Sequence, residues 1–195
     1  MAAVKHWLVL LWCVGWLGCG GPTPPPPPNP ASPAATVASN APSASSSSDS
    51  EPVFHLATAQ VNLPRVRLWI GAREIVSEVC VTVPQIATGL MHRPSIGPEE
   101  TMLFVFGSAR ERSFYMKNVP FDIDVAYIDP EGVIQEVVRL KANDAKGVPS
   151  RSSRIQFVLE AAPDYFTRNG FGPGTLIATD RGGLAQTLAP LAQLQ

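Results

Sequence analysis

The sequence predicts an α+β domain that is mainly antiparallel β, compact and barrel-like, with one or two short helices. Three observations lead to this prediction. From residue 53 onward, apolar side chains mostly alternate with polar ones, which is the period of a half-buried β-strand. The alternating runs are short, and turns that contain Pro or Gly separate several of them. Helical spacing of apolar residues occurs only in a few short stretches.

The first predicted elements are two strands and a helix. Every second side chain is apolar in residues 66–70 and again in residues 78–83, which predicts a strand in each. Pro84 then suits the first turn of a helix, and apolar residues four apart give that helix one apolar stripe. The helix is predicted over residues 84–93, because Pro94 limits its extension.

In the second half of the domain, the sequence predicts a hairpin and several shorter elements. Residues 102–106 are apolar on both faces, which is typical of a strand buried on two sides. Residues 129–132, Asp-Pro-Glu-Gly, predict a tight turn. The other expected elements are an extended piece at 114–116, hairpin strands at 121–127 and 133–140, a polar loop at 141–154, a strand at 155–159, a short helix at 163–169, a strand at 176–178 and a terminal amphipathic segment at 184–191.

The first 19 residues resemble a bacterial lipoprotein signal. Lys5 precedes an apolar run, residues 7–18, that would rise only about 18 Å as a helix, too little for a bilayer core of about 30 Å. A small residue directly before Cys19 is similar to the lipobox, although Trp16 stands where the lipobox has Leu. We therefore expect Cys19 to be lipidated, with ordinary signal-peptidase cleavage nearby as the alternative. Gly20 is not the Asp of inner-membrane retention, so we expect an outer-membrane lipoprotein facing the periplasm or the cell surface.

The remaining chain divides into a linker and one domain. Ten of the 20 prolines lie between residues 22 and 52, and Ala, Ser and Asn fill most of that stretch. Residues 20–52 are therefore predicted to be a disordered linker that holds the domain at residues 53–195 away from a membrane. Cys80 is the one cysteine of that domain, and we expect a buried, unreactive thiol and no disulfide.

The composition argues against several classes of protein. The 15 Lys and Arg balance 16 Asp and Glu, for a net charge of -1, so the basic excess of a nucleic-acid binder is missing. With 45% hydrophobic residues the chain is not wholly disordered. It has no phosphate-binding loop, no Gly-x-Ser-x-Gly elbow and no His-Glu-x-x-His motif. His55 and His92 are isolated, so we expect neither a metal site nor a cofactor.

Three segments carry a resemblance to a known family. They are Gly-Leu-Met-His-Arg at 89–93, Thr-Met-Leu-Phe-Val-Phe at 101–106, and Phe-Tyr-Met-Lys-Asn-Val-Pro-Phe-Asp-Ile at 114–123. In order and spacing they resemble the uncharacterised prokaryotic family known as domain of unknown function 192, over roughly residues 66–178. The likeness continues through Tyr-Ile-Asp at 127–129 and Val-Leu-Glu at 158–160. The resemblance implies a compact β-rich fold and no particular activity.

The chain departs from that family pattern at three positions. Tyr115 replaces a Trp and keeps an aromatic platform, Val119 replaces a Thr and removes a hydroxyl, and Thr101 replaces a Gly. The loss of the Thr hydroxyl weakens the transfer of any ligand site from the family to this chain.

The third segment also supplies the predicted site. A turn at Pro120 is expected to bring Lys117 close to Asp122, and Arg93 at the end of the predicted helix would complete a cluster. Cationic and amide donors beside aromatic walls are typical of a polar-ligand cleft. The candidate ligand-binding residues are therefore Arg93, Tyr115, Lys117, Asn118 and Asp122.

The second carboxylate of this stretch is Asp124. On one strand face it would lie roughly 6.5–7 Å from Asp122, a spacing that allows acid/base chemistry or cation binding. We nevertheless expect Asp124 to be solvated. Arg151 and Arg154 are candidate partners for Glu160 at the end of its strand, and the sequence does not decide whether either pairs with it.

Several interpretations of the predicted cluster stay open at this point. Lys117 and Asp122 would be a structural ion pair, with Asn118 fixing the turn, or they would bind a small polar or anionic ligand. An enzyme is the further alternative: a hydrolase acting on envelope material, with Asp122 as acid/base and Lys117 tuning it. A scaffold for partner proteins is another. The methionines and phenylalanines of the three segments are expected in the core.

Overall fold

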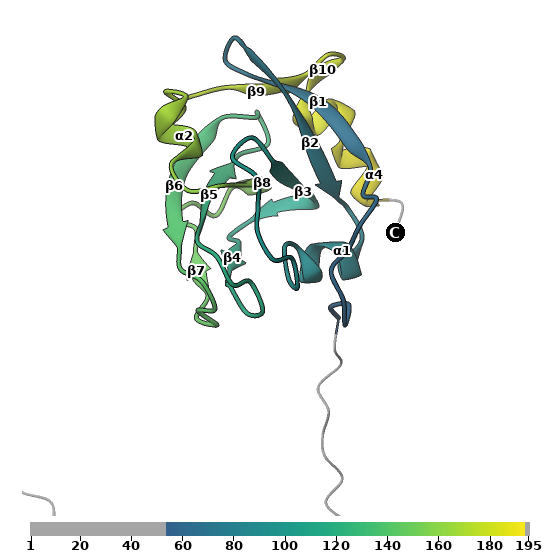
Figure 1. Ribbon diagram of the computed structural model, residues 1–195. Coiled ribbons are helices and arrows are strands. Elements are labelled where there is room, and N and C mark those ends of the chain that lie inside the picture. The colour runs from purple at the N-terminus through teal and green to yellow at the C-terminus, as the bar shows by residue number, and fades with distance from the viewer. Residues whose placement is uncertain (1–53, 194–195) are drawn as a thin grey trace, which may run out of the picture. The chain divides into compact units, whose positions relative to one another are not determined.

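The computed structural model describes residues 54–193. The predicted signal, the lipidation of Cys19 and the linker at 20–52 lie outside the described residues. Within them the chain is mostly β, as predicted, and forms an eight-stranded sheet, a two-stranded ladder and four short helices (Figure 1). The predicted class, α+β with mainly antiparallel strands, is therefore confirmed.

The strand order in the large sheet is β10-β9-β1-β2-β3-β8-β5-β6. These strands are β1 (Arg65–Ile70), β2 (Arg73–Cys80), β3 (Thr101–Arg110), β5 (Ile123–Ile128), β6 (Ile134–Leu140), β8 (Ile155–Ala161), β9 (Ile177–Thr179) and β10 (Gly182–Gly183). The small ladder pairs β4 (Ser113–Phe114) with β7 (Val148–Pro149), so the predicted polar loop at 141–154 contains a short strand.

One pair of neighbours in the sheet is parallel. β2 and β3 run in the same direction, whereas the other paired strands within residues 54–193 are antiparallel. A parallel pair needs a crossover connection, since the chain must return to the end where it started. Residues 81–100 make this crossover and carry the helix α1 (Val83–Thr88) (Figure 1).

The sheet is not closed into a barrel. An isolated bridge joins Val133, just before β6, to Leu176, just before β9. The amide of Ile177 also donates to the carbonyl of Gly132 at 2.8 Å. These contacts link the segment before β6, the last strand of the order, to the segment before β9 at one point, and the domain is compact and β-rich without full closure.

The helix α1 is shorter than the predicted 84–93. It begins at a capping box, in which the Gln85 amide donates to the Thr82 hydroxyl at 3.2 Å. It ends at Gly89, whose φ of +48° and ψ of -127° no residue with a Cβ adopts easily. The apolar residues after Gly89 therefore belong to a loop of the crossover, although they keep the spacing that suggested a longer helix.

Each face of the sheet carries an apolar cluster. Neighbouring residues of β3 alternate between them, with Leu103 in one and Phe104 in the other. The first cluster is covered by α2 (Tyr165–Arg168), α3 (Leu184–Thr187) and α4 (Ala189–Gln193). The second is covered by the crossover and by the segment around Met116 and Val119. The predicted site lies on the side of this second cluster.

Among residues 54–193, no helix has the length and apolar character needed to cross a bilayer.

Candidate functional site

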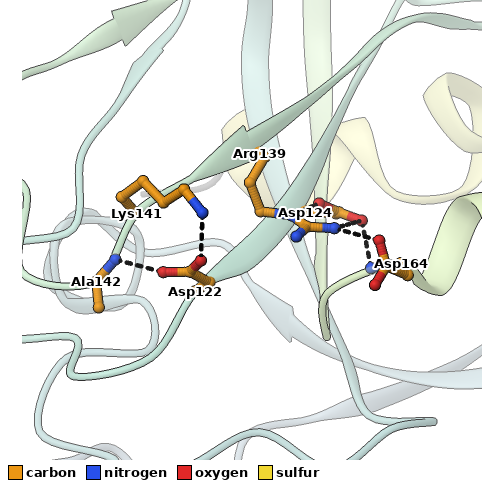
Figure 2. Close-up of polar contacts among 6 residues, drawn as sticks. All are labelled: Asp122, Asp124, Arg139, Lys141, Ala142 and Asp164. Carbon is orange, nitrogen blue, oxygen red and sulfur yellow. Dashed lines mark hydrogen bonds and ion pairs between the residues drawn. The ribbon is translucent and has the colours of Figure 1, made fainter.

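The predicted pair of Lys117 and Asp122 does not form. One carboxylate oxygen of Asp122 accepts from Lys141 Nζ at 2.7 Å and the other from the Ala142 amide at 2.9 Å (Figure 2). These bonds, that of Lys141 first, hold the pKa of Asp122 below its ordinary value. Lys117 is exposed and makes no ion pair or hydrogen bond with any residue that the structure describes. Asp122 therefore holds the segment after β6 in place through its bonds to Lys141 and Ala142.

Arg93 and Asn118 have structural partners. The Arg93 guanidinium forms an ion pair with Glu78 at 2.7 Å and donates to the carbonyl of Gln60 at 3.0 Å. Asn118 has a φ of +60°, and its carbonyl accepts from the amide of His92 at 2.9 Å. This bond joins the crossover to the turn after β4. Neither residue meets Lys117 or Asp122 in the cluster that the sequence predicted.

Asp124 is buried, which corrects the expectation of a solvated carboxylate. It is 5% exposed and lies on β5, which pairs with β6 and with β8. Its carboxylate pairs with Arg139 on β6 and accepts from the Asp164 amide at 2.7 Å, and Arg139 also reaches the Asp164 carboxylate at 2.6 Å (Figure 2). Asp124 and Asp122 therefore each have their own cation and are not a free carboxylate pair.

A cavity of about 460 Å³ opens on the second apolar cluster. Its walls come from the crossover, from β3, from β4 with the residues on either side of it, and from one residue each of β5 and β8. The lining includes Gly89, Met91, Phe104, Phe114, Tyr115, Met116 and Glu160. All three segments that carry the family resemblance thus meet around one cavity, and of the five predicted site residues only Tyr115 lines it.

Glu160 is the buried acid of this cavity. It lies near the end of β8, where its register neighbours are Met102 on β3 and Val125 on β5. Glu160 is 5% exposed, and its Oε2 has no hydrogen-bond partner among the described residues. Among residues 54–193, three other side chains have a buried polar atom without a hydrogen-bond partner. Of these four side chains, only that of Glu160 lines the cavity.

The surroundings of Glu160 favour its neutral form. Burial raises the pKa of Glu160 to about 8, and the charge of Arg93 opposes this only in part. Most of the carboxyl is therefore protonated at neutral pH. The candidate partners of Glu160 are bound elsewhere: Arg151 pairs with Glu136, and Arg154 pairs with Glu131. Neither candidate ion pair of Glu160 forms.

The backbone at Gly89 leaves space above this carboxyl. A Cβ at Gly89 would lie 3.2 Å from Cζ of Phe104 and 3.9 Å from Oε2 of Glu160. Such an atom would fill the part of the cavity that adjoins the carboxyl and crowd the aromatic ring. A glycine at position 89 therefore allows the positive φ and keeps a Cβ away from the Phe104 ring and the Glu160 carboxyl.

Aromatic rings form much of the cavity wall. Phe104 and Phe114 meet edge to face with their centroids 5.0 Å apart, and Phe106 meets Phe114 in the same way at 6.4 Å. The Arg112 guanidinium lies over the Phe106 ring, 3.7 Å from its centroid. Arg112 also donates to backbone carbonyls, and its burial lowers its pKa to about 10. The cavity is thus aromatic, with an acid on one wall.

Cys80 is buried on the same face of the sheet, as expected. Burial raises the pKa of its thiol, the charge of Glu160 adds to this, and the Gln60 amide donates to the sulfur at 3.6 Å. The thiol is inert at neutral pH. No group of three or more His, Cys, Asp or Glu within residues 54–193 is placed to hold a metal ion.

Glu160 was not among the site residues predicted from the sequence. The signal was present, because Glu160 is a lone acid in the run Phe-Val-Leu-Glu-Ala-Ala of residues 157–162. An ionisable residue inside a strand that is otherwise apolar on both faces indicates a buried charge or a site.

Comparisons with known proteins agree with this fold. Residues 66–179 match the model of the family DUF192, described as an uncharacterized ACR. A solved structure from Sinorhizobium meliloti 1021, described as a "putative transcription regulator", is 27% identical with a TM-score of 0.58, covering 62% of this chain and 98% of its own. A Novosphingobium aromaticivorans protein of unknown function, 23% identical, has a TM-score of 0.56 over 66% of this chain and 97% of its own, and shows the fold alone. No curated protein matches.

Proposed function

Because the chain belongs to the DUF192 family, for which no activity is described, its function must be inferred from its own site, and we propose that it binds a small organic molecule in the Glu160 cavity. The volume of about 460 Å³ falls in the range of known ligand pockets. Aromatic and apolar walls with one polar group are also the usual composition of such pockets.

The observation that carries the proposal is the unpartnered Oε2 of Glu160. A buried polar atom without a partner costs about 1–3 kcal/mol, so proteins rarely keep one without a use for it. Here the atom belongs to a side chain that lines a cavity, and Gly89, whose added Cβ would lie 3.9 Å from that atom, lines the same cavity. A bound molecule with a polar group at that position would supply the missing partner.

This proposal replaces the ligand site predicted at Lys117, Asn118 and Asp122. Those residues do not line the cavity, and Asp122 is engaged by Lys141. A hydrolase with Asp122 as its acid is not favoured, since the lowered pKa of Asp122 makes it a poor proton donor near neutral pH. Tyr115 remains in the site as part of the aromatic wall.

The proposed location is the cell envelope. Its support is the sequence pattern of residues 1–19, in which Cys19 follows a short apolar run. A lipid at Cys19 would place the binding domain at a membrane surface through the linker. Labelling of the expressed protein with a radioactive fatty acid tests this, with Cys19→Ser as the control that should lose the label. Labelling of the Cys19→Ser protein would exclude lipidation at this residue.

A thermal-shift screen of the purified protein tests the binding function. A compound present at 100 times its dissociation constant adds about 2.7 kcal/mol, enough to raise the melting temperature by several degrees. We expect such shifts for the parent and for Asp122→Asn, whose substitution lies outside the cavity lining, and a loss of the shift in Glu160→Gln. Equal shifts in parent and Glu160→Gln would contradict the proposed site.

A further inference from the structure

We infer that the molecule bound in the Glu160 cavity carries an ammonium group, which pairs with the Glu160 carboxylate inside the aromatic walls. This inference rests on the proposed function and names the chemical class of its ligand. Three properties of the cavity lead to it: an acid without a cation of its own, aromatic rings around it, and a buried thiol and phenol beside the acid that stay neutral.

No cation of the described chain neutralises Glu160 directly. The positive charge of Arg93 acts on Glu160 and lowers its pKa. The Arg93 guanidinium, however, is bound to Glu78 at 2.7 Å and to the carbonyl of Gln60. Arg112 stacks on Phe106 and donates to backbone carbonyls. Glu160 therefore forms no ion pair with a described residue, and an ammonium group on a bound molecule would supply its positive partner.

The walls of the cavity suit a cation. The face of an aromatic ring attracts positive charge, and the attraction grows when water is excluded. Phe104, Phe106, Phe114 and Tyr115 all line the cavity. Arg112, 3.7 Å from the centre of the Phe106 ring, already places one cation against this wall. An ammonium group with an apolar substituent would contact both the rings and the acid.

The two buried ionisable groups beside Glu160, a thiol and a phenol, do not compete with this role. On β2, Cys80 has a raised thiol pKa, and on β5, Tyr127 has a raised phenol pKa because both are buried. The Tyr127 hydroxyl donates to the carbonyl of Val148 at 2.6 Å. The remaining charged groups of the cavity are Arg110, Glu111 and Arg112, on the segment that leads from β3 to β4.

Binding of an ammonium ion must then displace the proton of Glu160. The free protein holds this carboxyl mostly protonated below pH 8. Pairing with the cation needs the carboxylate, so the proton leaves to the solvent and no covalent bond changes. The affinity for an amine should therefore rise with pH, close to tenfold from pH 6 to pH 7, while the amine itself stays charged.

Three compounds with one apolar body separate the possible ligand classes. Phenethylamine is a cation, 2-phenylethanol is neutral and 3-phenylpropionate is an anion. Binding is measured by calorimetry on the purified protein at pH 6, 7 and 8. Methionine methyl NMR locates it, with Met91 and Met116 lining the cavity and Met102 in the same cluster but not in the lining.

We expect phenethylamine to bind at least tenfold more tightly than the other two at pH 8 and to shift the Met91 and Met116 signals more than that of Met102. Titration at pH 7 in two buffers of different ionisation enthalpy should show release of close to one proton. Glu160→Gln should lose the preference for the amine, and Asp122→Asn should keep it.

The outcomes separate the two proposals. Equal or tighter binding of the alcohol or the acid at the same methyl groups would overturn the ammonium inference and leave the binding function standing. An amine affinity that Glu160→Gln leaves unchanged would overturn the ammonium inference and would also contradict the proposed site at Glu160. If none of the three compounds, nor any of a wider set of small organic molecules, moves the Met91 and Met116 signals, the binding function fails with it.

Discussion

Gly89 lies directly over the carboxyl of Glu160: a Cβ at Gly89 would stand 3.9 Å from Oε2 of that acid. The two residues are 71 positions apart in the sequence, and they meet because the crossover after β2 folds over the face of β8. Both residues line the cavity, and a substitution at either one tests their relationship.

The substitution Gly89→Ala tests the close approach of the crossover to Glu160. The alanine must adopt a φ of +48° with a ψ of -127°, and its Cβ would come within 3.2 Å of the Phe104 ring. We expect a loss of about 1–3 kcal/mol in the free energy of unfolding and weaker ligand binding. Urea unfolding and calorimetry measure the two effects. Gly170→Ala is the control, since its φ is also positive but nothing lies within 4 Å of its added Cβ. Equal loss of binding in both variants would argue against a specific role of Gly89.

Glu160→Gln should change how stability depends on pH. The pKa of Glu160 is about 8 in the folded protein and near its ordinary value of 4.5 when unfolded. The unfolded state therefore releases this proton first, and the contribution of Glu160 falls as pH rises from about 4.5 to 8, by up to about 1.4 kcal/mol per pH unit.

The amide cannot ionise, so the loss with rising pH should be absent in Glu160→Gln. We expect the variant to be close to the parent in stability at pH 5 and more stable at pH 8. Urea unfolding at pH 5, 6, 7 and 8 measures this. A parallel pH dependence in the two proteins would show that Glu160 is ionised in the fold at neutral pH.

Lys141→Ala and Lys117→Ala distinguish the observed pair of Asp122 from the predicted one. Removal of Lys141 should raise the pKa of Asp122 toward its ordinary value and lower the melting temperature slightly, because Asp122 is partly exposed. Removal of Lys117 should leave both unchanged. Carboxyl NMR titration of Asp122 gives the pKa in each variant. A shift on Lys117→Ala and none on Lys141→Ala would contradict the described pairing.

Arg139→Met should be more damaging than the removal of an exposed ion pair. It leaves the 5% exposed Asp124 without its cation, with only the Asp164 amide as a partner. We expect a loss of about 1–3 kcal/mol in unfolding free energy. Arg154→Met, which removes an exposed pair with Glu131, should change stability by about 0.5 kcal/mol or less. Similar losses in the two variants would contradict the buried role of Asp124.

The fold was largely predictable because its signals are local. Alternation in the strands and the Asp-Pro-Glu-Gly turn depend on neighbouring residues, and both are present in the structure. The helix end at Gly89 was missed, since the apolar spacing continues into the loop. The start of β2 at Arg73 was also missed, because Arg73 and Glu74 are both polar.

The site was less predictable because its partners are distant in sequence. Asp122 was assigned to Lys117, five residues away, but the strand pairing of β5 with β6 places Lys141 beside it. Asp124 was expected in solvent, because one sequence does not show that β5 has neighbours on both sides. The three family segments did mark the right region, but the acid that completes it comes from β8.

The parallel pairing of β2 with β3 has a consequence for how this domain can vary. Because the two strands are parallel, residues 81–100 must return along the sheet to the end where β3 begins. This connection forms one wall of the cavity, and strands including β3, β4 and β8 form the other. Insertions or substitutions in the connection could therefore reshape the cavity without altering any strand register. Engineering of new ligand preferences should begin in this stretch, with the paired strands kept as a constant frame.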